Sequence, residues 1–187
     1  EGSYSYSVKA AALNGTYTYD NKPVVYVGWG DAARFTNWLH NGQPIGAQNA
    51  TTTESGAYML NGAISDTALA AITRSTTAHW WVPSESEWYK AAFYNPSSAS
   101  YFLYPTRSDT LPNNNIPAND TGNSANGWSN GYTTGNENYP MTDAGAYTLS
   151  DSPYGTFDQG GNVREWTETL NAAGTKRRFR GGGWEVN

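Results

Sequence analysis

Residues 154–166 read Tyr-Gly-Thr-Phe-Asp-Gln-Gly-Gly-Asn-Val-Arg-Glu-Trp, and this stretch carries the strongest indication of the fold. Asp158 and Glu165 place two carboxylates around several backbone carbonyls within eight residues. Calcium takes about six to eight oxygen ligands, so a segment of this kind suits it. The simpler interpretation is a turn that begins at Asp158 and a surface ion pair between Glu165 and Arg164, which adds little stability. Because acidic loops are common, the spacing alone leaves both interpretations open.

Upstream of this stretch, residues 97–138 show no helical or strand periodicity and are dense in Asn, Gly, Ser, Thr and Pro. Aromatic residues are spread through the segment, which predicts ordered loops rather than a linker. Trp128, Tyr132 and Tyr139 lie on neither a helical nor a strand face. We favour the interpretation that they pack the loops onto a core, and the alternative is that some offer exposed rings to a sugar or a peptide.

The pattern between residues 30 and 41 predicts a helix. Ala32, Phe35 and Leu39 are spaced so that they share one apolar helical face. The dipeptide Asn41-Gly42 supplies the C-terminal stop.

A second helix is predicted over residues 84–94, where Ser84 and Glu87 have the spacing of a capping box. Short runs of β-branched and aromatic residues predict strands at 23–27, 57–60 and 79–82. A further strand pair is predicted within residues 1–22, broken at Asn14-Gly15.

Composition excludes several classes of function. The chain of 187 residues has 11 basic and 16 acidic side chains, so its net charge is −5. Nucleic-acid binding needs clustered Lys and Arg, so no nucleic-acid partner is expected. No apolar run approaches the roughly 20 residues that span a membrane, so no membrane span is expected. Cysteine is absent, which removes disulfides, thiolate metal sites and cysteine nucleophiles.

Two smaller features have ordinary structural interpretations. His40 and His79 stand alone at the ends of elements, without partners for catalysis or metal binding, and are expected to be structural. The basic run of Lys176, Arg177, Arg178 and Arg180 is expected to be a charged edge strand that discourages aggregation.

Four blocks of the chain, in this order and spacing, resemble the formylglycine-generating enzyme or sulfatase-modifying factor domain family. They are Pro23-Val-Val-Tyr-Val-Gly-Trp29 with the helix from Asp31 to His40, Val82-Pro-Ser-Glu-Ser-Glu-Trp-Tyr-Lys-Ala-Ala92, the stretch 154–166, and Phe179-Arg-Gly-Gly-Gly-Trp184. One block alone is weak evidence, whereas four in register are specific. The amino-acid sequences of both predicted helices are similar to those in the version of this domain found in exported bacterial surface proteins.

The resemblance implies an α+β domain with a C-type-lectin-like core, which has two helices, a small antiparallel sheet and long ordered loops. It also implies that residues 1–187 are a single domain. Domains of this family begin earlier and continue further, so the domain is expected to be truncated at both ends.

Calcium is the metal that the resemblance implies. Carried over residue by residue, a first site would use the side chains of Asp158 and Glu165 and the carbonyls of Gly161 and Val163. A second, weaker site would use Asn126, the Gly127 carbonyl, Glu137 and the Tyr139 carbonyl. The alignment for the second site crosses gaps.

The resemblance also raises the family's oxidase reaction, in which a sulfatase cysteine becomes formylglycine with copper and oxygen. Oxidase members hold copper with a pair of cysteines, because soft sulfur binds Cu(I) and other side chains do so poorly. Here Gly183 stands at the position of the serine in the last block, and Val186 stands at the position of the first cysteine. We therefore expect no catalytic residue and no copper site within these 187 residues.

The function expected is a non-catalytic, calcium-stabilised binding or structural module of an exported bacterial protein, located outside the cell or on its surface. Its partner would be an unidentified ligand, a glycan or a protein. One alternative is an oxidase of the formylglycine-generating type whose catalytic cysteines lie outside this chain. Another is a self-assembling surface protein, since exposed sheet edges invite pairing with a further chain.

Overall fold

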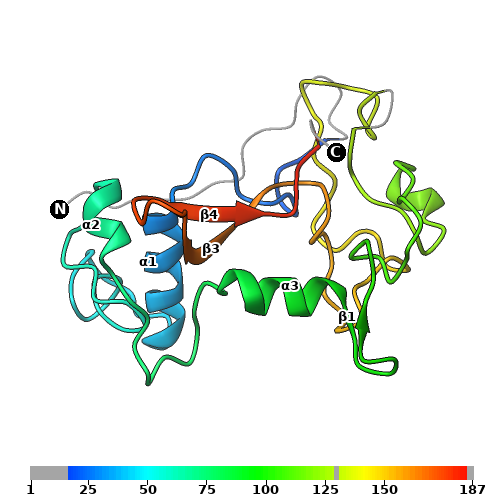
Figure 1. The fold of residues 1–187 in the computed structure, drawn as a ribbon. Coiled ribbons are helices and arrows are strands. Elements are labelled where there is room, and N and C mark those ends of the chain that lie inside the picture. Colours follow the sequence, from blue (N-terminus) through cyan, green and yellow to red (C-terminus); the bar gives the residue numbers. More distant parts are fainter. Residues whose placement is uncertain (1–16, 129–130, 185–187) are drawn as a thin grey trace. The chain divides into compact units, whose positions relative to one another are not determined.

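The computed structural model describes residues 17–128 and 131–184, which form an α+β fold with few helices and two small antiparallel sheets (Figure 1). These residues divide into two units. The first unit comprises residues 17–25, 91–164 and 181–184, and the second comprises 26–90 and 165–180. The strand pair predicted within residues 1–22 falls largely outside the described residues.

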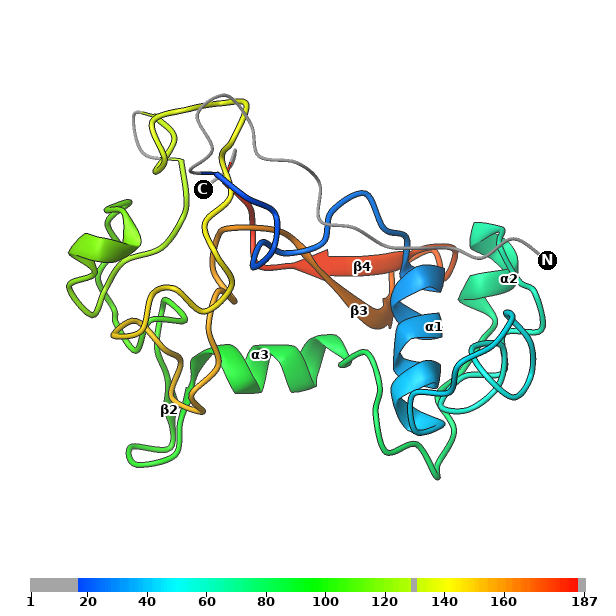
Figure 2. The ribbon, with the colours of Figure 1, turned by 180° about the vertical axis from the view of Figure 1, so that it is seen from behind.

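The second unit holds most of the regular structure. Its elements are helix α1 (Trp29–His40), helix α2 (Asp66–Ala70), the start of helix α3 (Glu85–Phe93), strand β3 (Glu165–Leu170) and strand β4 (Arg177–Arg180). Strands β3 and β4 pair in antiparallel fashion, with a register shift between Trp166 and Leu170. Figure 2 shows the same ribbon from behind, with β3 again beside α1.

Helix α1 confirms the predicted helix within one residue at each end. It begins where the Gly28 N–H donates to Asp31 Oδ2 at 2.8 Å. It ends where the N–H of Gly42 donates to the Leu39 carbonyl at 3.1 Å, with Gly42 in the left-handed region at a φ of 79°. The predicted Asn-Gly stop is therefore correct.

The predicted buried face of this helix is wrong. Phe35 is 58% exposed, and the buried residues are Trp29, Gly30, Ala33, Thr36 and Asn37. Asn37 is fully buried because its amide donates to the carbonyls of Thr53 and Tyr58 and accepts from the Tyr58 N–H, each at 2.8 Å. A polar residue thus lies at the centre of the packed face, since a distant loop satisfies all its hydrogen bonds.

The apolar core of the second unit gathers around the same helix. Its buried members are Trp29, Ala33, Ala57, Tyr58, Leu60 and Val82. The rings of Trp29 and Tyr58 meet edge to face with their centroids 5.3 Å apart. Trp166 packs against this cluster and its indole N–H donates to the Val27 carbonyl at 3.0 Å. Large aromatics therefore serve as core here.

The basic run forms β4, but it is not a row of solvated charges. The Arg177 guanidinium donates to the carbonyls of Leu69, Ile72 and Glu168. It also lies 4.0 Å above the Trp29 ring. Arg178 and Arg180 both pair with Glu85 on α3. These arginines connect the strand to its neighbours, so the expectation of a bare charged edge is wrong for Arg177.

None of the three short strands predicted in residues 23–82 forms. Tyr26 has a φ of 61°, which ends an extended conformation, and its side chain is fully exposed. Tyr58 makes only an isolated bridge to Arg74. Residues 79–82, predicted as a strand, form none, and Trp80 and Trp81 are 56% and 41% exposed.

The first unit is built mainly from loops, as predicted for residues 97–138. Its regular elements are strands β1 (Tyr94–Asn95) and β2 (Ser100–Tyr101), which pair with each other, and the 3₁₀ helix η1 (Pro117–Asn119). Several of its most deeply buried side chains are polar, namely Ser124, Asn126, Ser152 and Asn162. Where the backbone has few ladder partners, such side chains take over its hydrogen bonds. None of the helices in the described part of the chain combines the length and hydrophobicity that a membrane crossing needs.

Candidate functional site

The candidate site begins in the loop that carries Asp158, Gly161 and Val163. Asp158, Gly161 and Asn162 all have left-handed backbones, with φ values of 58°, 89° and 56°. Glycine, aspartate and asparagine are the residue types that adopt this conformation most readily. The residue types in this loop therefore favour its tightly coiled backbone.

Asp158 is half-buried, and its carboxylate accepts a hydrogen bond from the Gly145 N–H at 2.6 Å. Burial raises the pKa of this carboxyl above its ordinary value, and the Gly145 bond only partly opposes the rise. No cationic side chain of the described residues pairs with it. Within the described part of the chain, its charge is therefore balanced by no cationic side chain.

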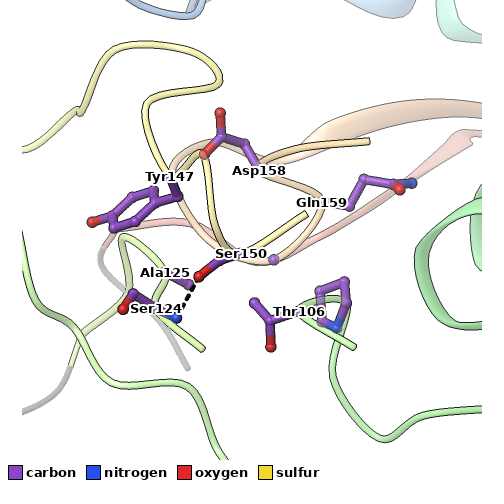
Figure 3. Close-up of a pocket in the computed structure, with 9 residues that line it drawn as sticks. Thr106, Ser124, Ala125, Tyr147, Ser150, Asp158 and Gln159 are labelled. Atoms are coloured by element: carbon purple, nitrogen blue, oxygen red, sulfur yellow. Dashed lines mark hydrogen bonds between the residues drawn. The ribbon is translucent and has the colours of Figure 1, made fainter. Parts of the chain in front are cut away.

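Asp158 also lines a small polar pocket of the first unit with room for about one water molecule (Figure 3). Tyr147, Ser150, Ser124 and Thr106 line the same pocket, and the Ser124 N–H donates to Ser150 Oγ at 2.9 Å. This volume suits an ion or a water and is too small for an organic ligand.

The carbonyls of Gly161 and Val163 come from the same loop. The Gly161 N–H donates to the Gly181 carbonyl at 2.7 Å, which ties the loop to the segment after β4. Neither carbonyl oxygen accepts a hydrogen bond from any residue of the described ranges. Within the described ranges, both oxygens therefore have no hydrogen-bond donor.

Glu165, the fourth predicted ligand of the first site, belongs to the second unit as the first residue of β3. Its carboxylate accepts a hydrogen bond from the Trp88 indole N–H of α3. The predicted surface pairing of Glu165 with Arg164 does not describe this contact. The structure thus collects Asp158, Gly161 and Val163 in one loop, while the described partner of Glu165 is Trp88.

Asn126, the first residue of the second predicted site, is 1% exposed. Its amide nitrogen donates to the Pro140 carbonyl at 2.8 Å and to Asn162 Oδ1 at 3.0 Å. These two acceptors fix which end of the amide is nitrogen. The remaining atom, Asn126 Oδ1, is buried and has no hydrogen-bond partner among the residues that the structure describes. A buried acceptor without a partner is costly, and an amide oxygen is a ligand that calcium accepts.

The other three predicted residues of the second site show less evidence of a role as calcium ligands. Gly127 follows Asn126 and its N–H donates to the Ala125 carbonyl at 3.1 Å. Glu137 is exposed, and the ring of Tyr139 packs 5.0 Å from that of Tyr17. Of these four residues, Asn126 alone shows a feature that a metal would satisfy.

The described residues hold no cluster of acidic side chains of the kind that binds a metal ion. Across residues 17–128 and 131–184, no group of three or more His, Cys, Asp or Glu side chains is positioned to hold a metal ion. Calcium bound here would therefore rely on amide and backbone carbonyl oxygens together with one or two carboxylates. Such a donor set is within the range that calcium uses.

Two features of the structure were not predicted from the sequence. His40 and His79, expected to be isolated, meet each other: the His79 N–H donates to His40 Nδ1 at 3.1 Å. Asn162, which is not a predicted ligand, is the most deeply buried residue of the quoted stretch. A polar residue between Gly161 and Val163 was the only sequence signal for it.

The exposed aromatics of the first unit pack partly on one another. Trp128 is 39% exposed and its ring meets that of Tyr132 edge to face at 4.9 Å. Tyr139 instead packs against Tyr17. Trp128 therefore retains an accessible face, and Tyr139 serves the packing of the loops.

Comparison with protein families gives one match. The model of the sulfatase-modifying factor enzyme 1-like domain matches residues 6–187. No curated protein matches the chain.

Proposed function

The chain belongs to the sulfatase-modifying factor enzyme 1-like domain family, and from that premise we propose that it is a non-catalytic, calcium-stabilised binding or structural module with a C-type-lectin-like fold. The absence of cysteine supports the non-catalytic part, because the family's copper chemistry needs a pair of thiolates. The single observation that carries the calcium part is Asp158, a half-buried carboxylate that no cation of the described residues compensates.

The residues that would hold calcium are Asp158 with the Gly161 and Val163 carbonyls, joined by Glu165, and Asn126 in the weaker site. When bound, the ion supplies positive charge and fills the coordination of buried oxygens. The protein's own residues coil the loop through the left-handed backbones of Asp158, Gly161 and Asn162. Calcium would thus replace the regular structure that the first unit lacks.

We place the module outside the cell or on its surface, where calcium is abundant enough to saturate sites of modest affinity. Its ligand would be a glycan or a protein. Trp128 supports this part of the proposal, since exposed tryptophan rings offer large contact area at low entropic cost.

Thermal melts in calcium and in chelator test this proposal, with the variant Asp158→Asn. If calcium is present at about a hundred times its Kd, the melting midpoint of the wild type should rise by about 5–10 °C. The variant should lose this rise, yet melt no lower than the wild type in chelator, because a neutral amide removes the uncompensated charge. Asp20→Asn, at an exposed aspartate of the same unit, is the control and should keep the full rise. Equal wild-type midpoints in calcium and chelator would refute calcium stabilisation.

Titration with Cu(I) tests the non-catalytic part of the proposal. We expect no tight binding, because the chain offers no thiolate. Stoichiometric tight binding would favour the alternative of an oxidase.

A further inference from the structure

Two buried amides lock together the segments that carry the two predicted calcium sites. Asn126 Nδ2 donates to Asn162 Oδ1 at 3.0 Å, and the Asn162 N–H donates to the Asn126 carbonyl at 2.7 Å. The hydrogen bonds therefore run in both directions. We refer to Asn126 and Asn162 together as the amide lock.

A third segment closes the amide lock. Asn162 exchanges two hydrogen bonds with the backbone of Thr142, accepting from its N–H and donating to its carbonyl, each at 3.2 Å. Asn126 donates to the Pro140 carbonyl at 2.8 Å. The lock thus binds residues 140–142, which directly follow Tyr139 of the second predicted site.

The lock leaves no room for one segment to move alone. Asn126 and Asn162 are 1% and 0% exposed. A Cβ added at Gly161 would lie 2.3 Å from the Asn126 carbonyl oxygen, so the two backbones are in direct contact. If either loop opened, the polar atoms of the other would stay buried without partners, and that is costly. The two loops should therefore open and close as one unit.

Each predicted site has ligands within one residue of the lock in the sequence. Asn162 separates Gly161 from Val163, whose carbonyls belong to the first site. Asn126 is itself a predicted ligand of the second site, and its buried Oδ1 has no partner among the described residues. An ion at one site would stabilise the closed form of both loops, so the second ion would meet an already ordered site.

We infer that the amide lock couples the two calcium sites, so that calcium at one raises the affinity of the other. This inference rests on the proposed function. Coupling between sites typically changes affinity by about 5–150-fold, and we expect about tenfold here. By linkage, the factor is the same in both directions.

Calorimetric titration of the calcium-free protein with CaCl₂ tests the inference. The wild type should bind two ions with a Hill coefficient above one. Two sites that bind independently, with equal or unequal affinities, give a Hill coefficient of one or less. A coefficient above one therefore indicates coupling between the sites. The variant Asn162→Ala should bind calcium with a coefficient of one or less.

The matched control is Asn37→Ala in the second unit. Asn37 is as buried as Asn162 and also makes several short hydrogen bonds to a distant loop. This variant should lose stability and keep cooperative calcium binding. If Asn162→Ala does not fold, the wild-type titration still decides, because cooperativity is measured without any variant.

The outcomes separate the two proposals. Two ions bound with a coefficient of one or less, or a single ion bound, would overturn the coupling and leave calcium stabilisation standing. No bound calcium would overturn the proposed function and the coupling with it. Cooperative binding that persists in a folded Asn162→Ala variant would also refute the role of the lock.

Discussion

Asp120 and Asp158 show how the surroundings of one side chain set its chemistry. Burial raises the pKa of Asp120, but hydrogen bonds from Ser150, Gly122 and Leu149 outweigh it, and the pKa ends below its ordinary value. For Asp158, burial raises the pKa more than the hydrogen bond from the Gly145 N–H lowers it, so the pKa ends above the ordinary value. Hydrogen bonds from the protein thus stabilise the charged form of Asp120 without an ion. For Asp158 the single hydrogen bond does not outweigh the effect of burial. Composition and spacing alone do not distinguish these two loop aspartates; the resemblance singles out Asp158.

Glu54 permits a prediction about pH. It is 7% exposed and accepts hydrogen bonds from Arg34, Gln48 and the Gly62 N–H. Burial raises the pKa of Glu54, but these bonds outweigh it, so the folded-state pKa lies below the unfolded one. Its stabilisation is therefore complete above the unfolded pKa and disappears as pH falls through the folded pKa. Glu54→Gln should lower the free energy of unfolding by about 3 kcal/mol at pH 7.

Urea melts across pH 2–7 measure this effect. The difference in the free energy of unfolding between the wild type and Glu54→Gln should become smaller as the pH falls, because protonation of Glu54 removes the same charge as the substitution. Asp66→Asn, at an exposed ion pair with Lys176, should cost about 0.5 kcal/mol or less. If this difference in the free energy of unfolding were the same at every pH, Glu54 would not be a stabilising charged group with a lowered pKa in the folded protein.

The ends of the helices were predictable from sequence, whereas their buried faces and the strands were not. A cap depends on residues within one turn, so Ser84, Glu87 and Asn41-Gly42 identify the ends locally. The face of α1 depends on Asn37, whose partners lie in residues 53–58. The buried face of α1 was misjudged because sequence spacing cannot show that such partners exist.

The N-terminus of α3 gives a prediction at this scale. The Glu87 N–H donates to Ser84 Oγ at 3.2 Å and the Ser84 N–H donates to Glu87 Oε2 at 2.7 Å, which confirms the capping box. Ser84→Ala should lower the free energy of unfolding by about 1 kcal/mol in chemical denaturation. Ser86→Ala, the same change at an exposed position of the helix, should cost nothing because alanine favours helices. Equal losses in both variants would argue against the cap.

The coiled loop of the candidate site gives a second prediction. Gly161 and Gly155 both have left-handed backbones, with φ values of 89° and 74°. A Cβ at Gly155 would meet open space, whereas at Gly161 it would collide with the Asn126 backbone. Gly155→Ala should therefore cost about 1–2 kcal/mol, the penalty of the left-handed conformation alone. Gly161→Ala should cost clearly more and should also abolish calcium binding, as judged by denaturation and calcium titration.

At the scale of the whole molecule, the two units differ in what fills their interiors. The second is built on an apolar cluster around Trp29 and Tyr58. The first buries Ser124, Asn126, Ser152 and Asn162 and has little regular structure. The low charge and high content of Asn, Ser and Thr in the sequence reflect this polar interior. Those side chains are structural components of the fold, and the composition alone did not show which of them are buried.

Much of the candidate site followed from the resemblance, and the rest needed the structure. The match over residues 6–187 confirms the family, whereas the ligand positions stay predictions from the resemblance. Neither the orphaned Asn126 Oδ1 nor the partners of Asn162 can be read from spacing. These contacts join residues 36 positions apart, and only the folded chain brings them together.

Calcium content tests the central claim most directly. The purified protein is dialysed to equilibrium in millimolar calcium, and the metal is measured in the protein solution and in the surrounding buffer. We predict at least one bound calcium per chain for the wild type and Asp20→Asn, and a loss of at least one ion in Asp158→Asn. Equal calcium concentrations inside and outside the dialysis membrane for the wild type would contradict the claim that this fold is held by calcium.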